Sequence, residues 1–492
     1  MTEFGYLSPV RLLSGLDRQP RVDRAAHEAI HGAFETESLD DLVDAAKKVD
    51  LRGRGGAAFP FARKVTSVAS AARSRDCSPV VLVNATEGEP ASMKDHFLLA
   101  RTPHLILDGA LLAARALGAR QVVVAVSDRG LARRSIRSAV TEGRLDDVIR
   151  VVSVPERFVT GESGALVSCV NGGQPLPPGR KVRSSENGVG GLPTLLSNAE
   201  TFAQLALLGR LGPDGYAAVG TPDEPGTVLL TVWGTDARPN IIETPTGVPL
   251  AQVLELCGAD AGQGVLIGGY HGVWLAPEAA ASVRLSREDV KKAGGLLGAG
   301  VILPLNPQAC PLGEAARVAA YLGEESSGQC GPCRLGLPST AQALGMLAVG
   351  DRGRDALAAV QRGVETIPGR GACNHPDGAI RFVRSTLAVF AEDVETHLAH
   401  GTCGRPVAGL MPVVRDDPPA PEDDTSSVRL EVDWTRCAAH GLCGQLAPGL
   451  VQLDENGYPI IADEDVPHRL VAEAQEAVEK CPALALRLNE TD

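Results

Sequence analysis

The strongest constraint on the fold is a pair of cysteines in the run SSGQCGPCR, residues 326–334. Cys330 and Cys333 are separated by Gly and Pro, which favour a tight turn, so both thiols can point at one metal centre. A third cysteine, Cys373, follows in the run GRGACNHP, residues 369–376. A C-x2-C pair alone is compatible with structural zinc, a redox disulfide or a corner of an iron–sulfur cluster. The rest of the chain has to decide among these three.

A second group of cysteines lies near the C-terminus. Cys437, His440 and Cys443 form a C-x2-H-x2-C run, and Cys481 follows 38 residues later, directly before a proline. Bacterial ferredoxins use C-x2-C-x2-C with a distant C-P for iron–sulfur clusters, and His440 stands at the middle cysteine position here. We predict a [4Fe–4S] cluster if His440 ligates iron and a [3Fe–4S] cluster if it does not. Zinc on three cysteines and one histidine is the alternative.

Length and charge limit the possible functions. A chain of 492 residues predicts about three domains, and its net charge of −13 argues against binding to nucleic acid or to an anionic membrane surface. The chain begins with the polar run MTEF, and no apolar stretch reaches about 18 residues, so we expect no signal peptide and no membrane insertion. We therefore expect a cytoplasmic protein, in which the eleven cysteines are thiols or metal ligands.

Apolar runs alternate with helical patterns in the first half of the chain. Strands are predicted at residues 79–84, 121–126 and 148–154, with helices at 103–117 and near 132–141. This alternation predicts a parallel sheet with right-handed crossovers. Ligands of such sheets lie beyond the carboxyl ends of the strands, so we expect the site there.

The pattern then changes three times, which predicts a multidomain α/β protein. An N-terminal helical segment of about fifty residues and the parallel sheet occupy residues 1–225, and 226–300 have the pattern of a small mixed β domain. Residues 301–410 are mostly helical and contain the Cys330 pair. Proline and acidic residues at 411–427 predict an extended linker, and 428–492 form a small α+β domain.

Two glycine- and acid-rich loops are candidates for binding a phosphate or a flat ring. In LRGRGGAAFP, residues 51–60, three glycines allow close approach of the backbone, and Arg52, Arg54 and Lys64 add positive charge. Acids and amides follow the strand at 79–84 and occur in the run GESG at 161–164. A plain turn explains the glycine loop almost as well, and helix caps explain the acids at about even odds.

The order of six motifs resembles a known family. The motifs are LRGRGGAAFP with Lys64, VNATEGEPASMKD (83–95), TGESGAL (160–166), GLPTLLSNAET (191–201), SSGQCGPCR (326–334) and Cys373. Residues 51 to about 400 resemble the flavin-bearing, NADH-oxidising subunit of respiratory complex I and its soluble relatives in NAD-linked hydrogenases and formate dehydrogenases. The last domain, 428–492, resembles single-cluster ferredoxins, a group often paired with cytochromes P450.

The resemblance implies cofactors and site residues. It implies FMN held by the glycine loop and polar side chains, NADH stacked near Phe59, Glu89 and the basic stretch 180–183, a β-grasp module after residue 226, and a [4Fe–4S] cluster in the helical domain. The implied cofactor-binding residues are Gly53, Arg54, Gly55, Gly56, Phe59, Lys64, Asn84, Glu87, Glu89, Gly161, Glu162 and Asn198. The implied metal ligands are Ser327, Cys330, Cys333 and Cys373, with Cys437, His440, Cys443 and Cys481 in the last domain.

The chain departs from the family pattern at several of these positions. Ser327 replaces the first of four cluster thiols, which leaves a labile, three-iron or absent cluster open. The other departures are Ala58 for a glycine, Thr86 and Ser163 for acids, and Ser67 and Arg183 for aromatic residues. Those at Ser67 and Arg183 bear on NADH, whereas the residues implied for FMN are retained.

We therefore predict an oxidoreductase that takes electrons from NADH through FMN. Single electrons would pass over the iron–sulfur clusters and leave through the fused ferredoxin to a protein partner, such as a cytochrome P450 or another oxidoreductase subunit. Two alternatives remain. In one, the chain is an electron-transfer flavoprotein with a donor other than NADH. In the other, it is a degenerate structural subunit in which only the last domain works.

Overall fold

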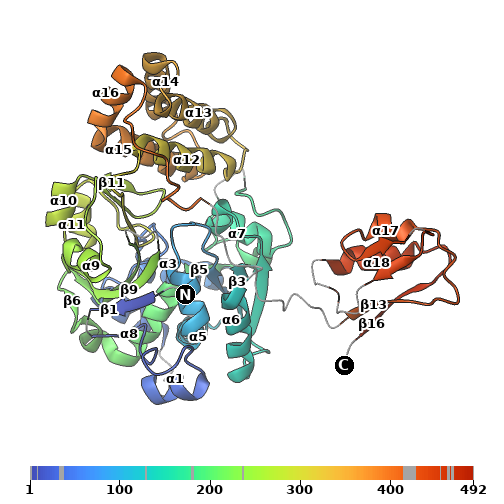
Figure 1. The fold of residues 1–492 in the computed structure, drawn as a ribbon. Helices are drawn as coiled ribbons and strands as arrows, with labels where there is room; N and C mark the ends of the chain where they lie inside the picture. The colour runs from blue at the N-terminus through green and yellow to red at the C-terminus, as the bar shows by residue number, and fades with distance from the viewer. Residues whose placement is uncertain are drawn as a thin grey trace. The chain divides into compact units, whose positions relative to one another are not determined.

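The computed structural model contains two compact units, residues 1–415 and 416–492. We call the described part of the first unit, up to residue 413, the body, and that of the second, residues 428–490, the tail (Figure 1). The described residues are 3–7, 9–32, 38–127, 130–178, 182–234, 238–413, 428–454, 456–461, 466 and 470–490. The predicted linker at 411–427 and the basic stretch 180–183 lie largely outside these ranges.

The predicted parallel sheet is present in the body. Its strands are β2 (Val80–Ala85), β3 (Gln121–Ser127), β4 (Ile149–Val154) and β5 (Thr194–Asn198), in the spatial order β4-β3-β2-β5. All three pairings are parallel. Alternate residues along β2 and β3 enter different buried clusters, which shows that both faces of the sheet are covered and explains the continuous apolar runs.

Helices of the first half surround this sheet. α5, predicted at 103–117, has these same bounds and packs against α8. The elements are α1 (Arg24–His31), α2 (Leu39–Lys48), α3 (Phe61–Ser74), α4 (Lys94–Arg101), α5 (Pro103–Leu117), α6 (Gly130–Glu142), α7 (Ser163–Val170) and α8 (Ala199–Ala217), with short 3-10 turns η1 (Phe158–Gly161) and η2 (Val189–Gly191). β6 (Gly220–Thr221) and β7 (Glu224–Pro225) form a small hairpin after α8.

A second sheet of six strands has the order β1-β9-β8-β12-β10-β11. Its elements are β1 (Glu3–Tyr6), β8 (Thr227–Trp233), β9 (Pro239–Pro245), β10 (Val265–Ile267), β11 (Val273–Leu275) and β12 (Val301–Pro304), with helices α9 (Leu250–Leu256), α10 (Pro277–Ser282) and α11 (Arg287–Lys292). β8 and β9 form an antiparallel hairpin, and β12 returns parallel to β8 at the centre of the sheet.

Two predictions about this region need correction. The first fifty residues are not helical throughout, because β1 is a strand that pairs in parallel with β9. A four-residue strand has little local signal, and its pairing partner lies more than 230 residues away, so only the tertiary structure reveals it. In addition, β12 completes the sheet although it follows the predicted boundary at residue 300.

Five helices form the last part of the body, as predicted for a mostly helical segment. They are α12 (Pro311–Glu324), α13 (Leu337–Ala348), α14 (Gly353–Thr366), α15 (His375–Val389) and α16 (Ala391–His400), and they gather together in Figure 1. A single π-helical turn, η3 (Pro332–Gly336), leads into α13 and contains Cys333. Such turns are rare and often occur at functional sites.

The tail has the α+β composition that was predicted. β13 (Val428–Val432) pairs antiparallel with β16 (Leu486–Glu490), and β14 (Val451–Leu453) pairs with β15 (Pro459–Ile461). Helices α17 (Leu442–Leu446) and α18 (Val471–Glu479) pack against each other.

Among the described residues, no single helix is long and apolar enough to cross a membrane. The helices α4 and α5 pass that test only as a pair, and they are bent by 96° where they meet.

Candidate functional site

The glycine loop is a short turn between α2 and α3. The N–H of Gly53 donates to the carbonyl of Phe59 at 3.0 Å, which closes the turn. Gly55 lies against Asn198: a Cβ there would come within 3.3 Å of the asparagine Cβ. Ala58 has a φ of 47°, in the left-handed region that favours glycine. The family has a glycine at this position because glycine adopts this φ without strain. The alanine here keeps the same conformation with some backbone strain.

The predicted polar residues at the strand ends come together. Asn84 and Asn198 are direct partners in the pairing of β2 with β5, at the carboxyl ends of both strands. The Asn84 amide donates to the carbonyl of Gly161 at 3.0 Å. Gly55 packs on Asn198. Residues from four separated motifs therefore meet at one edge of the parallel sheet, where a ligand was expected.

Lys64 on α3 supplies a positive charge near this edge. Its Nζ donates to the carbonyl of Leu196, in the middle of β5, at 2.8 Å. No carboxylate lies within salt-bridge distance of this Nζ in the part of the chain that the structure describes. Burial lowers the pKa of Lys64 to about 8. A buried ammonium without an anionic partner fits the phosphate of FMN, because that phosphate would supply the missing charge.

Glu87 and Glu162 act as helix caps in this structure. The Glu87 carboxylate accepts from the backbone N–H groups of Asp95 and His96 at the start of α4. The Glu162 carboxylate accepts from the N–H groups of Gly164 and Ala165 at the start of α7. The capping role that the sequence left open is therefore present for both acids.

Glu89 and Phe59, which the resemblance assigns to NADH, have different environments. The Glu89 carboxylate accepts from the N–H of Tyr270 at 2.8 Å, which ties the loop after β2 to the second sheet. Phe59 is 46 % exposed, as a ring that stacks on a ligand has to be before the ligand binds. Arg183 is exposed as well.

Arg54 does not present its guanidinium group as a free phosphate ligand. Its side chain is buried, with Nε 3.9 Å from the Glu200 carboxylate, and an Nη donates to the carbonyl of Thr227 at 3.4 Å. Burial would lower the pKa of Arg54, but Tyr216 and Glu200 more than offset it and raise the pKa. Its backbone N–H donates to Thr201. Arg54 therefore fixes the glycine loop to α8 and β8.

The buried network of charged side chains around Arg54 was not predicted from the sequence. Lys94 Nζ lies 2.7 Å from Glu200 and 3.2 Å from Asp95, and the Asp95 carboxylate accepts from the Asn198 amide at 3.0 Å. Burial raises the pKa of Asp95 to about 6, with Lys94 opposing the shift. The sequence does contain a sign of this network. Lys94 and Asp95 are adjacent opposite charges, and Glu200 is a further acid; all three lie within motifs that carry the resemblance. This network holds Asn198 in place beside the glycine loop.

The central cysteines converge in the helical region. Cys330 and Cys333 flank the start of η3, Cys333 is 2 % exposed, and Cys373 lies just before α15. Burial raises the pKa of Cys333 to about 11, and the neighbouring Cys330 and Cys373 add to the shift. Burial also acts on Cys330, but backbone N–H groups, first that of Ala372, lower its pKa overall. The two cysteine loops are therefore in contact through Cys330.

The central cysteines lie close to residues of the strand-end site. Burial raises the pKa of Cys373 and the charge of Glu162 adds to the rise, whereas the backbone N–H of His375 lowers it, so Glu162 and Cys373 interact electrostatically. The link is also direct: the Glu325 carboxylate, just before Ser327, accepts from the N–H of Phe158 at 2.9 Å. Phe158 begins the η1 turn that ends at Gly161. One short segment thus connects the two sites.

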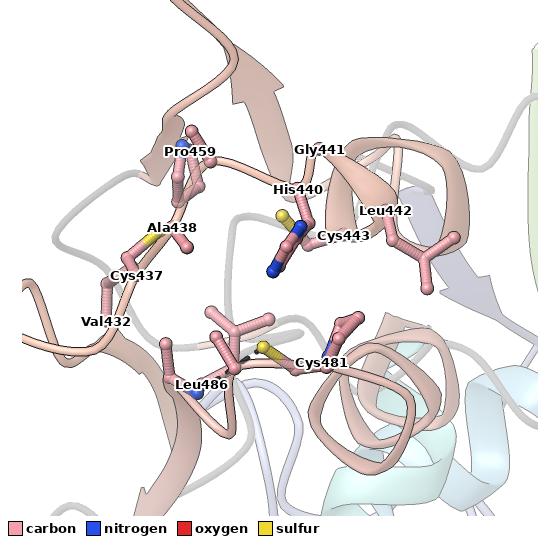
Figure 2. A pocket seen from close by; sticks show the side chains of 14 residues that line it. Val432, Cys437, Ala438, His440, Gly441, Leu442, Cys443, Pro459, Cys481 and Leu486 are labelled. Carbon is pink, nitrogen blue, oxygen red and sulfur yellow. Dashed lines mark hydrogen bonds between the residues drawn. The ribbon is translucent and has the colours of Figure 1, made fainter.

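The tail cysteines line a small, partly open pocket. Cys437, His440, Cys443 and Cys481 all line it, and Figure 2 shows the His440 ring between the sulfur atoms of Cys443 and Cys481. Burial raises the pKa of Cys443, and the neighbouring Cys437 and Cys481 contribute to the rise. The Cys481 sulfur also accepts from the N–H of Ala485 at 3.4 Å.

The spacing of the donors distinguishes a cluster from a single ion. In neither predicted cluster site do three of the described ligand atoms lie within 4.8 Å of one another. Around one tetrahedral zinc ion the sulfur atoms would be only about 3.8 Å apart. In a cluster each thiolate binds a different iron, so wider spacing is expected. Among the described residues, neither site therefore shows the compact set of three cysteine or histidine donors that one zinc ion would need.

Comparisons with known proteins agree with this geometry. Residues 46–207 match the Nuo51 FMN-binding domain, 313–397 match the NADH-ubiquinone oxidoreductase-F iron-sulfur binding region, and 430–488 match a 4Fe-4S single cluster domain. The chain is similar to the F subunits of NADH-quinone oxidoreductases. It is 26 % identical to the F 2 subunit of Rhizobium meliloti over 395 residues, which cover 77 % of this chain and 93 % of the relative. The predicted resemblance is thereby confirmed.

Further relatives give the same result. The F subunit of the Mycobacterium tuberculosis enzyme, strain H37Rv, is 28 % identical over 387 residues, covering 74 % of this chain and 86 % of the relative. Among solved structures, a chain of an NAD+-reducing [NiFe]-hydrogenase in the H2-reduced state is 28 % identical with a TM-score of 0.69, and the match covers 80 % of this chain and 67 % of that chain. The FMN and iron–sulfur predictions are confirmed at the level of domains.

Proposed function

We propose that the chain oxidises NADH through FMN and passes single electrons over its central cluster and then its tail cluster to a protein partner. FMN, when bound, accepts the two electrons of a hydride together and releases them one at a time. The observation that carries the proposal is the link between the two sites in the body. Glu162 is near Cys373, and Glu325 holds the segment that leads to Gly161. A flavin at the strand ends would thus lie beside the first iron–sulfur centre.

The residues at the strand ends would bind and orient the flavin. Lys64 would pair with the phosphate, and the glycine loop would let the backbone approach the ligand. Asn84 and Asn198 would offer amide groups to the polar edge of the ring. Glu87 and Glu162 would act through the N-termini of α4 and α7, which they cap. The nicotinamide nucleotide would stack near Phe59, with Glu89 holding the facing loop.

Ser327, Cys330, Cys333 and Cys373 would hold the central cluster. Cys437, Cys443 and Cys481, with His440 at the fourth position, would hold the tail cluster. We also propose that β8 to β12 are the β-grasp module, which the central parallel pair of β8 and β12 supports. The domain boundaries that fit the strands best are then 226–305 for this module and 306–413 for the helical region.

The partners would be NAD(H) and another oxidoreductase. The relatives are named as subunits of NADH-quinone oxidoreductases, which favours a second oxidoreductase subunit as partner. A cytochrome P450 is the finer proposal, based on the predicted resemblance of the tail to ferredoxins with a C-x2-H-x2-C pattern. We propose a cytoplasmic location for this exchange.

Rapid mixing of the flavin-loaded protein with NADH and, separately, with NADPH tests the proposal. NADH is expected to bleach the visible flavin absorption within the first turnover, and the cluster absorption should fall afterwards. A donor other than NADH predicts stable flavin absorption with both nucleotides but bleaching by dithionite. A degenerate body predicts no flavin at all. The Lys64→Met variant is the control, since its weaker FMN binding should lower the flavin content and with it the amplitude of the fast phase.

A further inference from the structure

Three side chains outside both predicted cluster sites form the tightest group of metal-binding donors in the body. Only one group of at least three His, Cys, Asp or Glu side chains among the described residues has ligand atoms that all lie within 4.8 Å of one another. Cys310, His397 and Cys403 form this group. Cys310 and His397 are each 2 % exposed, and Cys403 is partly exposed. No predicted function uses any of these residues.

The elements of the helical region bring these donors together from distant positions. Cys310 is the N-cap of α12, His397 lies in the last turn of α16, and Cys403 follows that helix by three residues. The Cys310 sulfur accepts from the N–H of Gly313 at 3.3 Å. The N-terminus of α12 therefore favours negative charge on this sulfur, as a metal-bound thiolate requires.

The histidine already presents a lone pair to the two cysteines. The N–H of Cys403 donates to His397 Nε2 at 3.2 Å, and a backbone N–H can only donate, so Nε2 is unprotonated. The same Nε2 lies 3.5 Å from the Cys310 sulfur. A tetrahedral zinc ion with ordinary Zn–S and Zn–N lengths would place such a pair about 3.6 Å apart. The observed spacing thus matches one ion, and metal binding would replace the hydrogen bond from the Cys403 N–H, because Nε2 has a single lone pair.

The second ring nitrogen of His397 is also informative. Its Nδ1 is buried and has no hydrogen-bond partner at good geometry within the described part of the chain. The backbone carbonyl groups of Leu347 and Ala348 nevertheless lie beside this ring. Metal-bound histidines commonly direct the other N–H at a backbone carbonyl, and a small rotation would complete this bond.

We propose that Cys310, His397 and Cys403 bind one divalent metal ion of the zinc class. Binding releases the two thiol protons and forms two metal–sulfur bonds and one metal–nitrogen bond. The fourth position is left to a water molecule on the exposed side of Cys403. The site differs from both predicted clusters, in which no three cysteine or histidine donors among the described residues lie this close together, so it would hold a single ion in a chain that otherwise carries iron and sulfide.

The ion would fasten the end of the body. We call residues 401–413 the closing segment. It already binds α12: the N–H of Cys310 donates to the carbonyl of Pro406 at 2.8 Å, and the buried Glu314 carboxylate accepts from the N–H of Gly409 at 2.6 Å. A metal bridge between Cys310 and Cys403 would add a strong link at the start of this segment. The position from which the chain leaves for the tail would then be fixed.

Zinc analysis of the anaerobically purified full chain tests the site. We expect one zinc per chain in addition to full iron and sulfide, and zinc-edge X-ray absorption with two sulfur scatterers at about 2.3 Å and a nitrogen at about 2.0 Å. Cys403→Ala should bind zinc at least about 100-fold more weakly, because even losing an outer partner of a ligand costs 10–100-fold. Its iron content and flavin should not change. Cys257→Ala, at another partly buried cysteine of the body, should keep the zinc.

Three outcomes would overturn the proposal. Zinc that persists in Cys403→Ala would have to occupy another site, such as an empty cluster site. A native chain with no zinc after incubation with zinc chloride would show that the donors do not bind it. A mass two hydrogens lower, mapped to a Cys310–Cys403 disulfide in the anaerobic protein, would mean that the pair is oxidised instead.

Discussion

The central site of the body and the site of the tail have the same donor count but different surroundings. Each has three cysteines and one residue of another type, Ser327 in the body and His440 in the tail. The body has four buried hydrophobic clusters, and its cysteines lie at the edge of one helical part. The described tail has one small cluster of seven buried residues, and Cys443 and Cys481 pack directly against it. We therefore expect the tail to depend on its metal centre for folding and the body to fold without its central cluster.

The fourth residues also differ in chemistry. A serine must lose its proton to bind iron, and an alkoxide is costly to form at neutral pH. A neutral imidazole needs no such step, and it removes one negative charge relative to a thiolate, which raises the reduction potential. We therefore expect Ser327 to weaken its cluster and His440 to tune the potential of its cluster. The four predictions below test this contrast in order of decreasing effect.

Loss of one cysteine should unfold the tail and spare the body. In Cys481→Ala the tail should lose its cluster and its fold, because a core of this size contributes only about 3–5 kcal/mol by itself. Cys333→Ala should lose the central cluster but keep FMN and a folded body. Limited proteolysis of the full chain with mass spectrometry, together with iron and flavin content, measures both effects. Equal protease resistance of the two variants would contradict the proposed difference.

Restoring a fourth thiol should affect the two sites differently. Ser327→Cys should give a longer-lived four-iron centre in the body, with little change elsewhere. His440→Cys should lower the reduction potential of the tail cluster by on the order of 100 mV, since it adds a thiolate charge. Redox titration followed by electron paramagnetic resonance measures the potentials, and the time course of iron release measures the lifetimes. If Ser327→Cys leaves the iron content, spectrum and lifetime unchanged, the serine has no effect on the cluster.

Flavin binding to the body should depend on Lys64 and not on either cluster. Lys64→Met should weaken FMN binding by roughly 10- to 100-fold, the effect of one charged hydrogen bond, and Lys64→Arg should weaken it less. Burial holds the pKa of Lys64 at about 8 in the absence of a phosphate, so the group is charged below that pH. The phosphate stabilises the charged form, so FMN affinity should fall as the pH rises above about 8. Fluorescence titration across this range should show no such fall in Lys64→Met.

The smallest predicted effect concerns two strained alanines, one in each unit. Ala58 in the glycine loop and Ala439 beside His440 have φ of 47° and 52°. Replacing each with glycine removes left-handed strain of about 1–2 kcal/mol and adds a somewhat smaller entropic cost. A net gain of about 0.5 kcal/mol in the free energy of unfolding is expected, and urea titration measures it. Ala57→Gly, whose φ is not positive, should destabilise instead; a gain there would show that strain is not the cause.

The sequence by itself determined the local and repeating features of this protein. Buried apolar runs identified the strands β2 and β3, because strands covered on both faces have little need of polar residues. The spacing of cysteines in the central turn and in the tail identified two metal centres, since ligands close in sequence must also be close in space. The glycine and asparagine motifs likewise predicted the strand-end site, at which Asn84 and Asn198 are now adjacent.

Only the tertiary structure decided which distant groups meet. It paired β1 with β9, turned the Arg54 side chain toward Glu200, and gave Glu87 and Glu162 their helix caps. It also brought Cys310 beside Cys403, across 93 positions of sequence, with His397 between them in the chain. Apart from the Glu162 cap, whose donors lie two and three residues further along the chain, these contacts have no local signal. Each depends on how whole helices and strands pack, and that packing is set by the sum of many buried contacts and not by the residues that finally touch.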